Sequence, residues 1–389
     1  MIDKSKTLIA LLLCTPIFGI GIDLYTPSLP HMSAYFNSTA TATKLSISLF
    51  MLGAFIGMIV FGTIADSLGR RKIVLWSLGL NMIFNIAIAL SPSMSWVIIF
   101  RFITGVCAGS VSSMNRAQAT DIFNAQEMKK VSSSMTIAWG LGPILAPFIG
   151  GLLQEYISWK ASFVFLAFYS FILMVFVYRY VPETHIHKHK LSLSEVFANY
   201  KLVLSCQQFL GATLQSGVLY MLLLYFGIIG SFYIQEILHY SAASFGYISL
   251  FIGIAYFTGT IVRRVLSFVD DKILMNISFV ILLTSNIVFL IMSFVFNQSL
   301  VILLINIFIA CFLVGILYPI YLSKTLSLFP QLGGTAGAIT GASVMLIISA
   351  MTSVASLFRI HTLTEFVVLY LVTIILVVII QMLTGTKKA

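Results

Sequence analysis

Long apolar runs, separated by short polar or basic segments, occupy most of the chain. Each run is long enough to cross the roughly 30 Å hydrocarbon core of a bilayer at about 1.5 Å per helical residue. Twelve runs can be counted, at about 7–29, 45–65, 73–91, 95–117, 132–154, 160–181, 206–234, 243–266, 273–295, 300–323, 335–357 and 364–384. The pattern predicts an all-α membrane protein with twelve transmembrane helices.

The longest polar stretch, about 182–203, separates six runs from six more. This division is typical of transporters built from two parallel halves. We therefore expect a six-helix bundle over 1–184, a cytoplasmic linker over 185–203 and a second six-helix bundle over 204–389, related by pseudo-symmetry. The linker carries His185, His187 and His189, but no Cys or acidic ligands converge on them, so we expect a hydrated linker and no metal site.

Composition supports a membrane protein, with 59% hydrophobic and 9% charged residues. The net charge of +10 does not indicate nucleic-acid binding, because the basic residues lie in short clusters between the runs. With a cytoplasmic N-terminus, the outer loops keep three basic residues, Lys44, Lys160 and Arg359. Seventeen lie inside, namely Lys4, Lys6, Arg70, Arg71, Lys72, Lys129, Lys130, Arg179, Lys188, Lys190, Lys201, Arg263, Arg264, Lys272, Lys324, Lys387 and Lys388. This asymmetry predicts a multi-pass membrane protein with both termini cytoplasmic. We expect the membrane to be a bacterial inner membrane.

Asp23 is the one acidic residue of the twelve that lies well inside an apolar run. A carboxylate in lipid costs at least roughly 2.5–3.5 kcal/mol, so it normally faces a protein interior or a watery cavity. Arg101, in the fourth run, is expected at a similar depth and also needs a partner. We expect the two to form the proton and substrate site, with pairing of Arg101 to backbone carbonyls as the alternative.

The loop after the second run reads Gly62-Thr63-Ile64-Ala65-Asp66-Ser67-Leu68-Gly69-Arg70-Arg71-Lys72. It resembles the signature G-x-L-A-D-R-x-G-R-[KR] of the major facilitator superfamily, with Ser67 in place of the usual basic residue. Arg101-Phe102-Ile103-Thr104-Gly105 is similar to the superfamily's R-x-x-Q-G motif. The resemblance implies the major facilitator fold and a gating loop made of Gly62, Asp66, Gly69, Arg70, Arg71 and Asp121, in which Asp121 pairs with Arg70.

The fifth run carries glycines and prolines that would destabilise a helix in water but are tolerated in membranes. They let neighbouring helices approach closely and bend the axis. The stretch is similar to the antiporter motif of drug/proton exchangers, which implies an antiporter helix with Gly140, Gly142, Pro143, Pro147, Gly150 and Gly151. Asp23-x-Tyr25-x-Pro27-x-x-Pro30, Gly315-Ile316-Leu317-Tyr318-Pro319 and 333–338 resemble the Bcr/CflA multidrug efflux group.

The resemblance implies a proton-coupled antiporter that exports small amphipathic compounds or drugs by alternating access, acting as a monomer. The alternative is a specific metabolite or siderophore transporter, for export or uptake, on the same fold. Tyr25, Asn115, Gln215 and Tyr220 are candidates for the cavity lining, which should be largely apolar. The partners expected are small-molecule substrates, protons and the bilayer. No cofactor or enzyme activity is expected, because no catalytic constellation or phosphate-binding loop occurs.

Overall fold

The computed structural model describes residues 3–184, 193–296 and 298–385. The described residues form helices and no strands, and twelve segments are long and apolar enough to span a membrane. The expected all-α class with twelve membrane helices is confirmed.

The spans are numbered 1 to 12 in chain order. Span 1 comprises α1 (Lys4–Cys14), α2 (Ile17–Asp23), η1 (Thr26–Ser28) and α3 (Leu29–Tyr35), and spans 2 to 6 are α4 (Ala40–Leu68), α5 (Arg70–Ala89), α6 (Met94–Ile122), α7 (Ala125–Tyr156) and α8 (Trp159–Tyr180). Span 7 comprises α10 (Gln207–Tyr225), η2 (Phe226–Gly230) and η3 (Tyr233–Ile237), and spans 8 to 12 are α11 (Ala242–Val265), α12 (Asp271–Val295), α13 (Leu300–Ser327), α14 (Gly333–Ser356) and α15 (Leu363–Gly385). A short turn, η4 (Pro330–Leu332), precedes α14.

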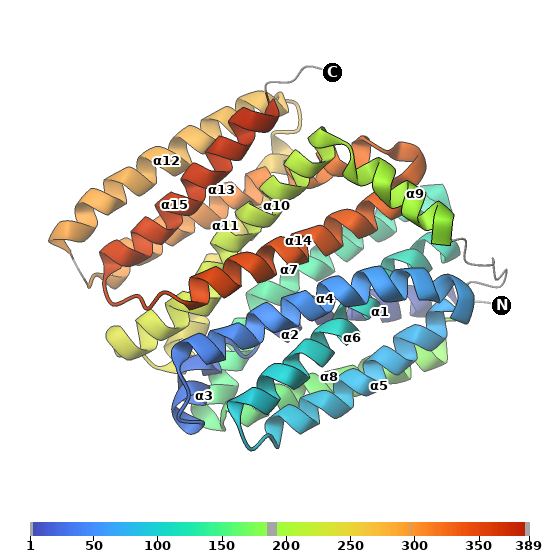
Figure 1. Ribbon diagram of the computed structural model, residues 1–389, viewed down its shortest axis with the longest axis horizontal. Coiled ribbons are helices and arrows are strands. Elements are labelled where there is room, and N and C mark those ends of the chain that lie inside the picture. Colours follow the sequence, from blue (N-terminus) through green and yellow to red (C-terminus); the bar gives the residue numbers. More distant parts are fainter. Residues whose placement is uncertain (1–2, 185–192, 297, 386–389) are drawn as a thin grey trace.

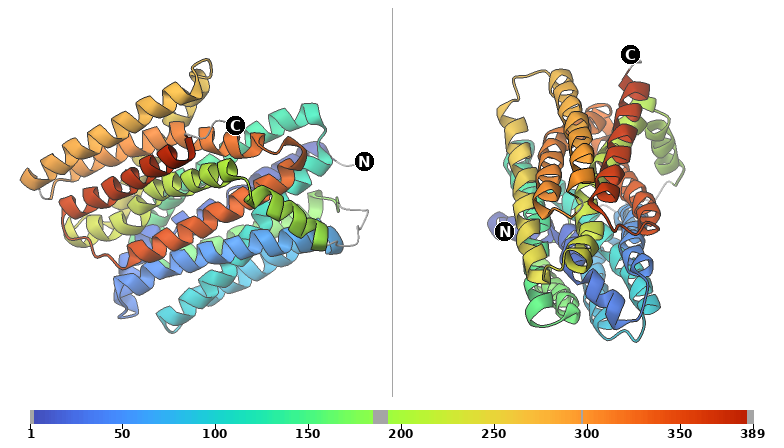
Figure 2. Two further views of the ribbon diagram at one scale, coloured as in Figure 1. Left: turned by 45° about the horizontal axis from the view of Figure 1, so that its top comes forward. Right: turned by 90° about the vertical axis from the view of Figure 1, so that its left-hand side faces the viewer.

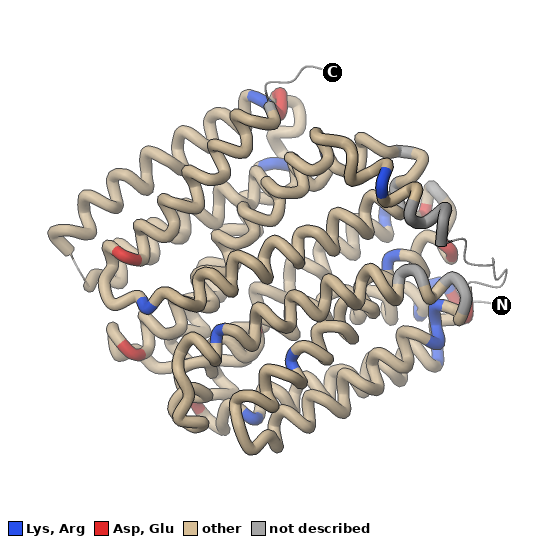
Figure 3. Tube along the Cα trace, viewed as in Figure 1, with Lys and Arg blue, Asp and Glu red and all other residues tan. Residues whose placement is uncertain are grey.

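The spans form two groups of six that lie side by side, α1–α8 and α10–α15 (Figures 1 and 2). Between the groups, α4 packs against α14 and α7 packs against α11. Both termini lie at the same end of the bundle, where the basic positions are concentrated (Figure 3). We call this end, which includes the α4–α5 junction at Gly69, the terminal face, and the opposite end the distal face.

A short helix, α9 (Leu193–Leu204), lies between the two groups in the region expected to be a linker. It contacts α10 and α14. The expected linker histidines, His185, His187 and His189, lie outside the described residues.

Span 1 is not one continuous helix. Its α2 segment ends at Asp23, a turn follows, and α-helix resumes at Leu29 after the short η1 segment. Pro27 explains the interruption, because it has no N–H to donate and it disfavours a helical residue before it. The expected range 7–29 is therefore too short, since span 1 continues to Tyr35 and both Pro27 and Pro30 lie inside it.

Span 7 is interrupted at a corresponding point. After Tyr225 the helix widens into the π-helical segments η2 and η3, a distortion frequent at functional sites. The two interruptions touch, since a Cβ on Gly227 would lie 3.5 Å from Cγ2 of Thr26. Gln235 Nε2 also donates to the Pro27 carbonyl oxygen at 3.0 Å. The first span of each half is thus broken where the halves meet.

Three hydrogen bonds join span 2 to span 11 and the residues just after it, near the distal face. Lys44 Nζ donates to the carbonyl of Phe358 at 3.1 Å, just beyond the end of α14, where carbonyl groups lack helical donors. Ser48 Oγ donates to Thr352 Oγ1 at 2.8 Å, and Ser349 Oγ donates to the Ser48 carbonyl at 2.8 Å. These bonds hold span 2 against span 11 and close the distal side between them.

Candidate functional site

A cavity lies where the interrupted spans 1 and 7 meet. It has about 620 Å³ of empty space, counted with its opening, and spans 1, 5, 7, 8 and 10 line it. Most of the lining is apolar or aromatic, and Asp23 is its one charged residue within the described part of the chain. A largely apolar cavity with few polar groups is typical of small-molecule sites.

Asp23 is the last residue of α2 and is only 8% exposed. Among the described residues no hydrogen bond or ion pair reaches its carboxylate, and Asp23 is part of the cavity lining. Its position at a helix C-terminus, the negative end of the helix dipole, gives the charge no support. Because a buried charge without a partner is costly, this carboxylate favours binding a proton or a cationic group.

Three aromatic rings from both halves pack beside the cavity. The ring centroid of Tyr220 lies 6.0 Å from that of Trp139 and 5.6 Å from that of Tyr318. Trp139 and Tyr318 are nearly parallel, at 4°, with centroids 6.4 Å apart. Tyr220 and Asp23 line the same cavity. The arrangement offers flat apolar faces next to a single carboxylate.

Arg101 lies elsewhere. Its side chain is fully buried between the rings of Tyr25 and Phe50, whose centroids lie 4.3 and 4.1 Å from the guanidinium carbon. It lines a different cavity, together with Gly21, and no ion pair joins it to Asp23 in this structure. Helix geometry gives the reason: Gly21 and Asp23 are two residues apart, about 200° around the axis, so they face opposite sides of α2.

Of the four cavity candidates, Tyr220 is in the lining and the other three are not. The hydroxyl of Tyr25 lies 3.0 Å from Ser46 Oγ, behind α2. The Asn115 amide donates to the Leu11 carbonyl at 3.0 Å and so joins α6 to α1. These two side chains are held by partners inside the first bundle.

Gln215 is held in the same way within the second bundle. Its Nε2 donates to the Val377 carbonyl at 2.8 Å and so ties α10 to α15. The side chain therefore points away from the cavity.

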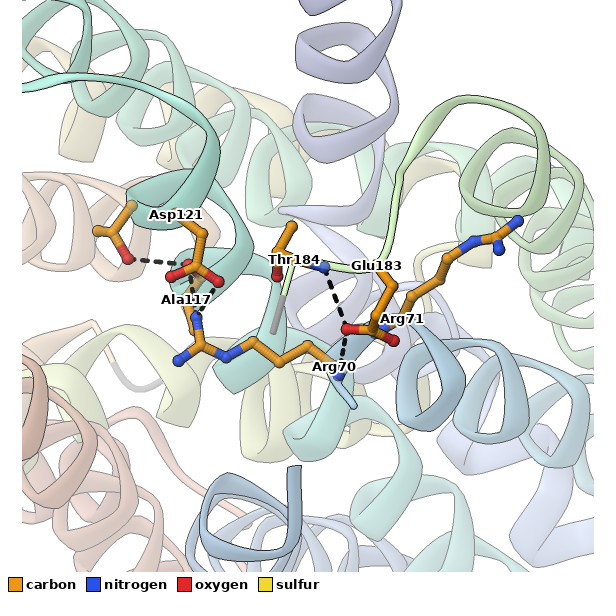
Figure 4. A network of polar contacts seen from close by, with 7 residues as sticks. Arg70, Arg71, Ala117, Asp121, Glu183 and Thr184 are labelled. Carbon is orange, nitrogen blue, oxygen red and sulfur yellow. Dashed lines mark hydrogen bonds and ion pairs between the residues drawn. The ribbon is translucent and has the colours of Figure 1, made fainter. Parts of the chain in front are cut away.

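The junction between α4 and α5 forms a polar network at the terminal face (Figure 4). Gly69 has a φ of 96°, and a Cβ there would lie 2.6 Å from a carboxylate oxygen of Glu183. That carboxylate accepts a hydrogen bond from the Arg70 backbone N–H at 2.9 Å. Arg71 Nη2 donates to the Tyr178 carbonyl at 2.5 Å. The turn thus needs glycine and is tied to the end of α8.

The same network contains the expected contact between Arg70 and Asp121. The Arg70 side chain forms an ion pair with the Asp121 carboxylate and donates to the Ala117 carbonyl at 3.0 Å, which joins α5 to α6 (Figure 4). Gly62 and Asp66 belong to the last turns of α4. The gating role of this loop stays a prediction.

The helix α7 lies between span 1 and span 8. A Cβ on Gly150 would lie 1.6 Å from the Leu24 carbonyl oxygen, and one on Gly151 would lie 2.6 Å from the Ala242 carbonyl oxygen. Of the other positions expected for an antiporter helix, Pro143 and Pro147 line the Asp23 cavity. Gly142 packs on Pro16, and Gly140 faces Phe257.

A sequence model of the Major Facilitator Superfamily matches residues 11–352. The chain belongs to the major facilitator superfamily. An uncharacterized transporter of Rickettsia felis is 27% identical over 374 residues, covering 92% of this chain and 91% of the relative. The chloramphenicol resistance protein CraA of Acinetobacter baumannii is 29% identical over 195 residues, covering 50% of this chain and 47% of CraA.

Among solved structures, a bacterial homologue of the human lysosomal transporter Spinster, in an inward-facing and occupied conformation, superposes with a TM-score of 0.77. It is 14% identical and covers 99% of this chain and 97% of that chain. At this identity the likeness shows the shared fold.

Sequence reasoning missed several lining residues of this major facilitator. Trp139 directly precedes the Gly140-x-Gly142-Pro143 stretch, and Thr26 directly precedes Pro27, so both lie beside motifs that were noticed. Tyr256 lies in span 8 without any local motif. Only its position across the cavity from Asp23 identifies it.

Proposed function

We propose that this major facilitator is a proton-coupled antiporter that exports small amphipathic compounds, drugs among them, by alternating access. The observation that carries the proposal is Asp23, a carboxylate without a partner, facing an aromatic cavity between the two halves. The relative CraA, named as a chloramphenicol resistance protein, supports an exporter of drug-sized molecules.

We infer that the terminal face is the cytoplasmic face, in a bacterial inner membrane. Basic loop residues gather on this face (Figure 3), and such residues are retained on the cytoplasmic side. In that orientation the Arg70–Asp121 network is cytoplasmic, and the Lys44–Phe358 contact closes the outer side.

Coupling follows from competition at Asp23. A proton and a cationic or hydrogen-bonding group of the substrate both neutralise the carboxylate, and only one does so at a time. Protonation from the outer side therefore displaces the substrate, and loss of the proton to the cytoplasm restores the binding site. When the exported substrate is uncharged, one proton moving down 100 mV supplies about 2.3 kcal/mol for each cycle. When the substrate is a monovalent cation, no net charge moves and the pH difference drives the exchange.

The lining favours loose recognition. Its polar groups besides Asp23 are few, whereas a carrier specific for one metabolite or siderophore needs several fixed donors and acceptors. Flat faces such as those of Trp139 and Tyr220 bind planar apolar groups of many kinds.

The test is proton-driven uptake into inverted membrane vesicles, with a panel of dyes, antibiotics and siderophores. Asp23→Asn should abolish proton-driven uptake. Asp271→Asn should retain it, because Asp271 pairs with Arg263 at the exposed start of α12. Unchanged uptake by Asp23→Asn for every compound would refute the proposal, and transport of a single siderophore or metabolite would favour the specific carrier.

A further inference from the structure

Two pairs of a cation and an aromatic ring lie at the terminal face, one on α5 and one between α5 and α8. Lys72 Nζ lies 4.9 Å from the ring centroid of Trp76. The guanidinium carbon of Arg71 lies 5.3 Å from the ring centroid of Tyr178, and Figure 4 shows Arg71 extending away from Asp121. Both rings are exposed, Trp76 by 58% and Tyr178 by 69%. Exposed Trp and Tyr side chains are typical of the level where hydrocarbon meets the lipid headgroups.

The two rings lie at nearly the same depth on neighbouring helices. The helices α5 and α8 pack together in opposite directions, and a Cβ on Gly79 would lie 3.8 Å from Sδ of Met174. Toward the terminal face, Trp76 is three residues from Gly79 and Tyr178 is four residues from Met174. At about 1.5 Å per residue, their depths differ by about 1.5 Å. We call the line between the helices, with the two rings beside it, the α5–α8 seam.

Exposed apolar side chains continue along each helix from its ring toward the middle of the bundle. They are 44% to 54% exposed and are Leu80 and Ile83 on α5 and Phe171 and Val175 on α8. The first two follow Trp76 by four and seven residues, and the last two precede Tyr178 by seven and three residues. Such spacings keep each set on one face of its helix. The seam thus presents two apolar stripes to the hydrocarbon chains of the bilayer.

Two cations at the terminal end of the seam lack a counter-charge. Lys72 lies one turn before the α5 stripe, Arg179 lies in the last turn of α8, and both are exposed. Among the described residues no ion pair reaches either side chain. Other basic residues of the same face do pair with carboxylates, namely Lys4, Lys6, Arg70 and Arg263. The seam therefore combines unpaired positive charge at headgroup level with apolar surface below it.

We propose that the α5–α8 seam binds an anionic phospholipid, with its phosphodiester in contact with Lys72 and Arg179 and its acyl chains along the two stripes. A phosphate accepts hydrogen bonds from both cations and supplies the charge that they lack. The phosphate of a zwitterionic lipid is already compensated by the ammonium group of its own headgroup. The seam should therefore prefer a headgroup without a cation. This site does not depend on the function proposed for Asp23, which lies in the cavity between the halves.

Quenching of tryptophan fluorescence by brominated lipids tests the proposal with the full-length protein in phosphatidylcholine vesicles. The reporter keeps Trp76 and carries Trp96→Phe, Trp139→Phe and Trp159→Phe. Brominated phosphatidylglycerol should quench Trp76 with a relative binding constant at least about fivefold that of brominated phosphatidylcholine, which is the factor expected from one cation near the surface. A second reporter, which keeps only Trp96, 48% exposed at the distal end of α6, should show no preference. Equal quenching of Trp76 by the two lipids, or an equal preference at Trp96, would overturn the proposal.

Charge substitutions in the Trp76 reporter separate a local site from the overall charge of the face. Lys72→Gln/Arg179→Gln should lower the preference to about one, whereas Lys72→Arg/Arg179→Lys keeps both charges and should retain it. Lys201→Gln/Lys324→Gln is the matched control, because it removes two exposed cations of the same face from α9 and α13, away from the seam. A preference that persists in Lys72→Gln/Arg179→Gln, or that falls equally in the control, refutes a site at the seam.

Discussion

The contact between Gly150 and the broken part of span 1 gives a quantitative prediction for Gly150→Ala. The added Cβ would lie 1.6 Å from the Leu24 carbonyl oxygen, whereas ordinary contact begins at 3.4 Å, so about 1.8 Å of separation (3.4 − 1.6) is needed. The atom that the new Cβ would meet belongs to the backbone, which cannot relieve the clash by changing rotamer as a side chain can. Overpacking typically costs about 1–3 kcal/mol, and we expect the upper end, which is about a hundredfold in the folding equilibrium.

The measurement compares the free energy of unfolding in detergent with proton-driven uptake in inverted vesicles. Gly150→Ala should lose stability and, because Leu24 is next to Asp23, also uptake. Gly140→Ala is the matched control in the same helix, since its Cβ would meet only Phe257, at 3.9 Å. Equal stability and uptake of the two variants would show that the close approach of α7 to span 1 has no energetic role.

Three further predictions concern the terminal face, the distal face and the cavity. Gly69→Ala forces a side chain into a positive φ and should lower unfolding stability by about 1–3 kcal/mol in thermal melts. Lys44→Met removes a charged hydrogen bond worth about 1.5–3 kcal/mol at the distal closure. A disulfide between cysteines at positions 48 and 352, in the variant Ser48→Cys/Thr352→Cys, reports the closed distal side. Adding Lys44→Met to that variant should lower the disulfide yield, whereas an unchanged yield would show that Lys44 does not contribute to the closure. Tyr220→Ala should weaken binding of a planar fluorescent dye up to about tenfold, while Tyr220→Phe, which keeps the ring, should not.

The fold could be predicted because the bilayer restricts what an apolar chain can do. Backbone groups in lipid must be paired within each segment, so an apolar run of sufficient length becomes a helix. The interruptions were harder to place. The first apolar run ends at about residue 29 because the stretch after it is mildly polar, although α-helix continues there to Tyr35. The π-helical turns after Tyr225 have no comparable signal, since they depend on packing against span 1.

The candidate site was predicted only in part. Asp23 stood out because a carboxylate in an apolar run is costly, and Tyr220 because it lies in the facing span. Tyr25 and Asn115 are equally polar and similarly placed in the sequence, yet they point into the first bundle. Depth in the membrane follows from counting residues, whereas the direction of a side chain around its helix also depends on how the helix is rotated against its neighbours.

The direction of a side chain around its helix also decides whether Asp23 and Arg101 can meet at another stage of transport. Both belong to the first bundle, in α2 and α6, so rocking of two rigid halves leaves the distance between them unchanged. A pair could form only if α2 turned by about half a revolution, because Asp23 faces the side opposite to Gly21. Such a turn would separate Gly21 from Phe50 and Leu24 from Gly150, which are in close contact. As long as these contacts hold, Asp23 and Arg101 stay on different sides of α2, so we do not expect them to exchange partners during transport.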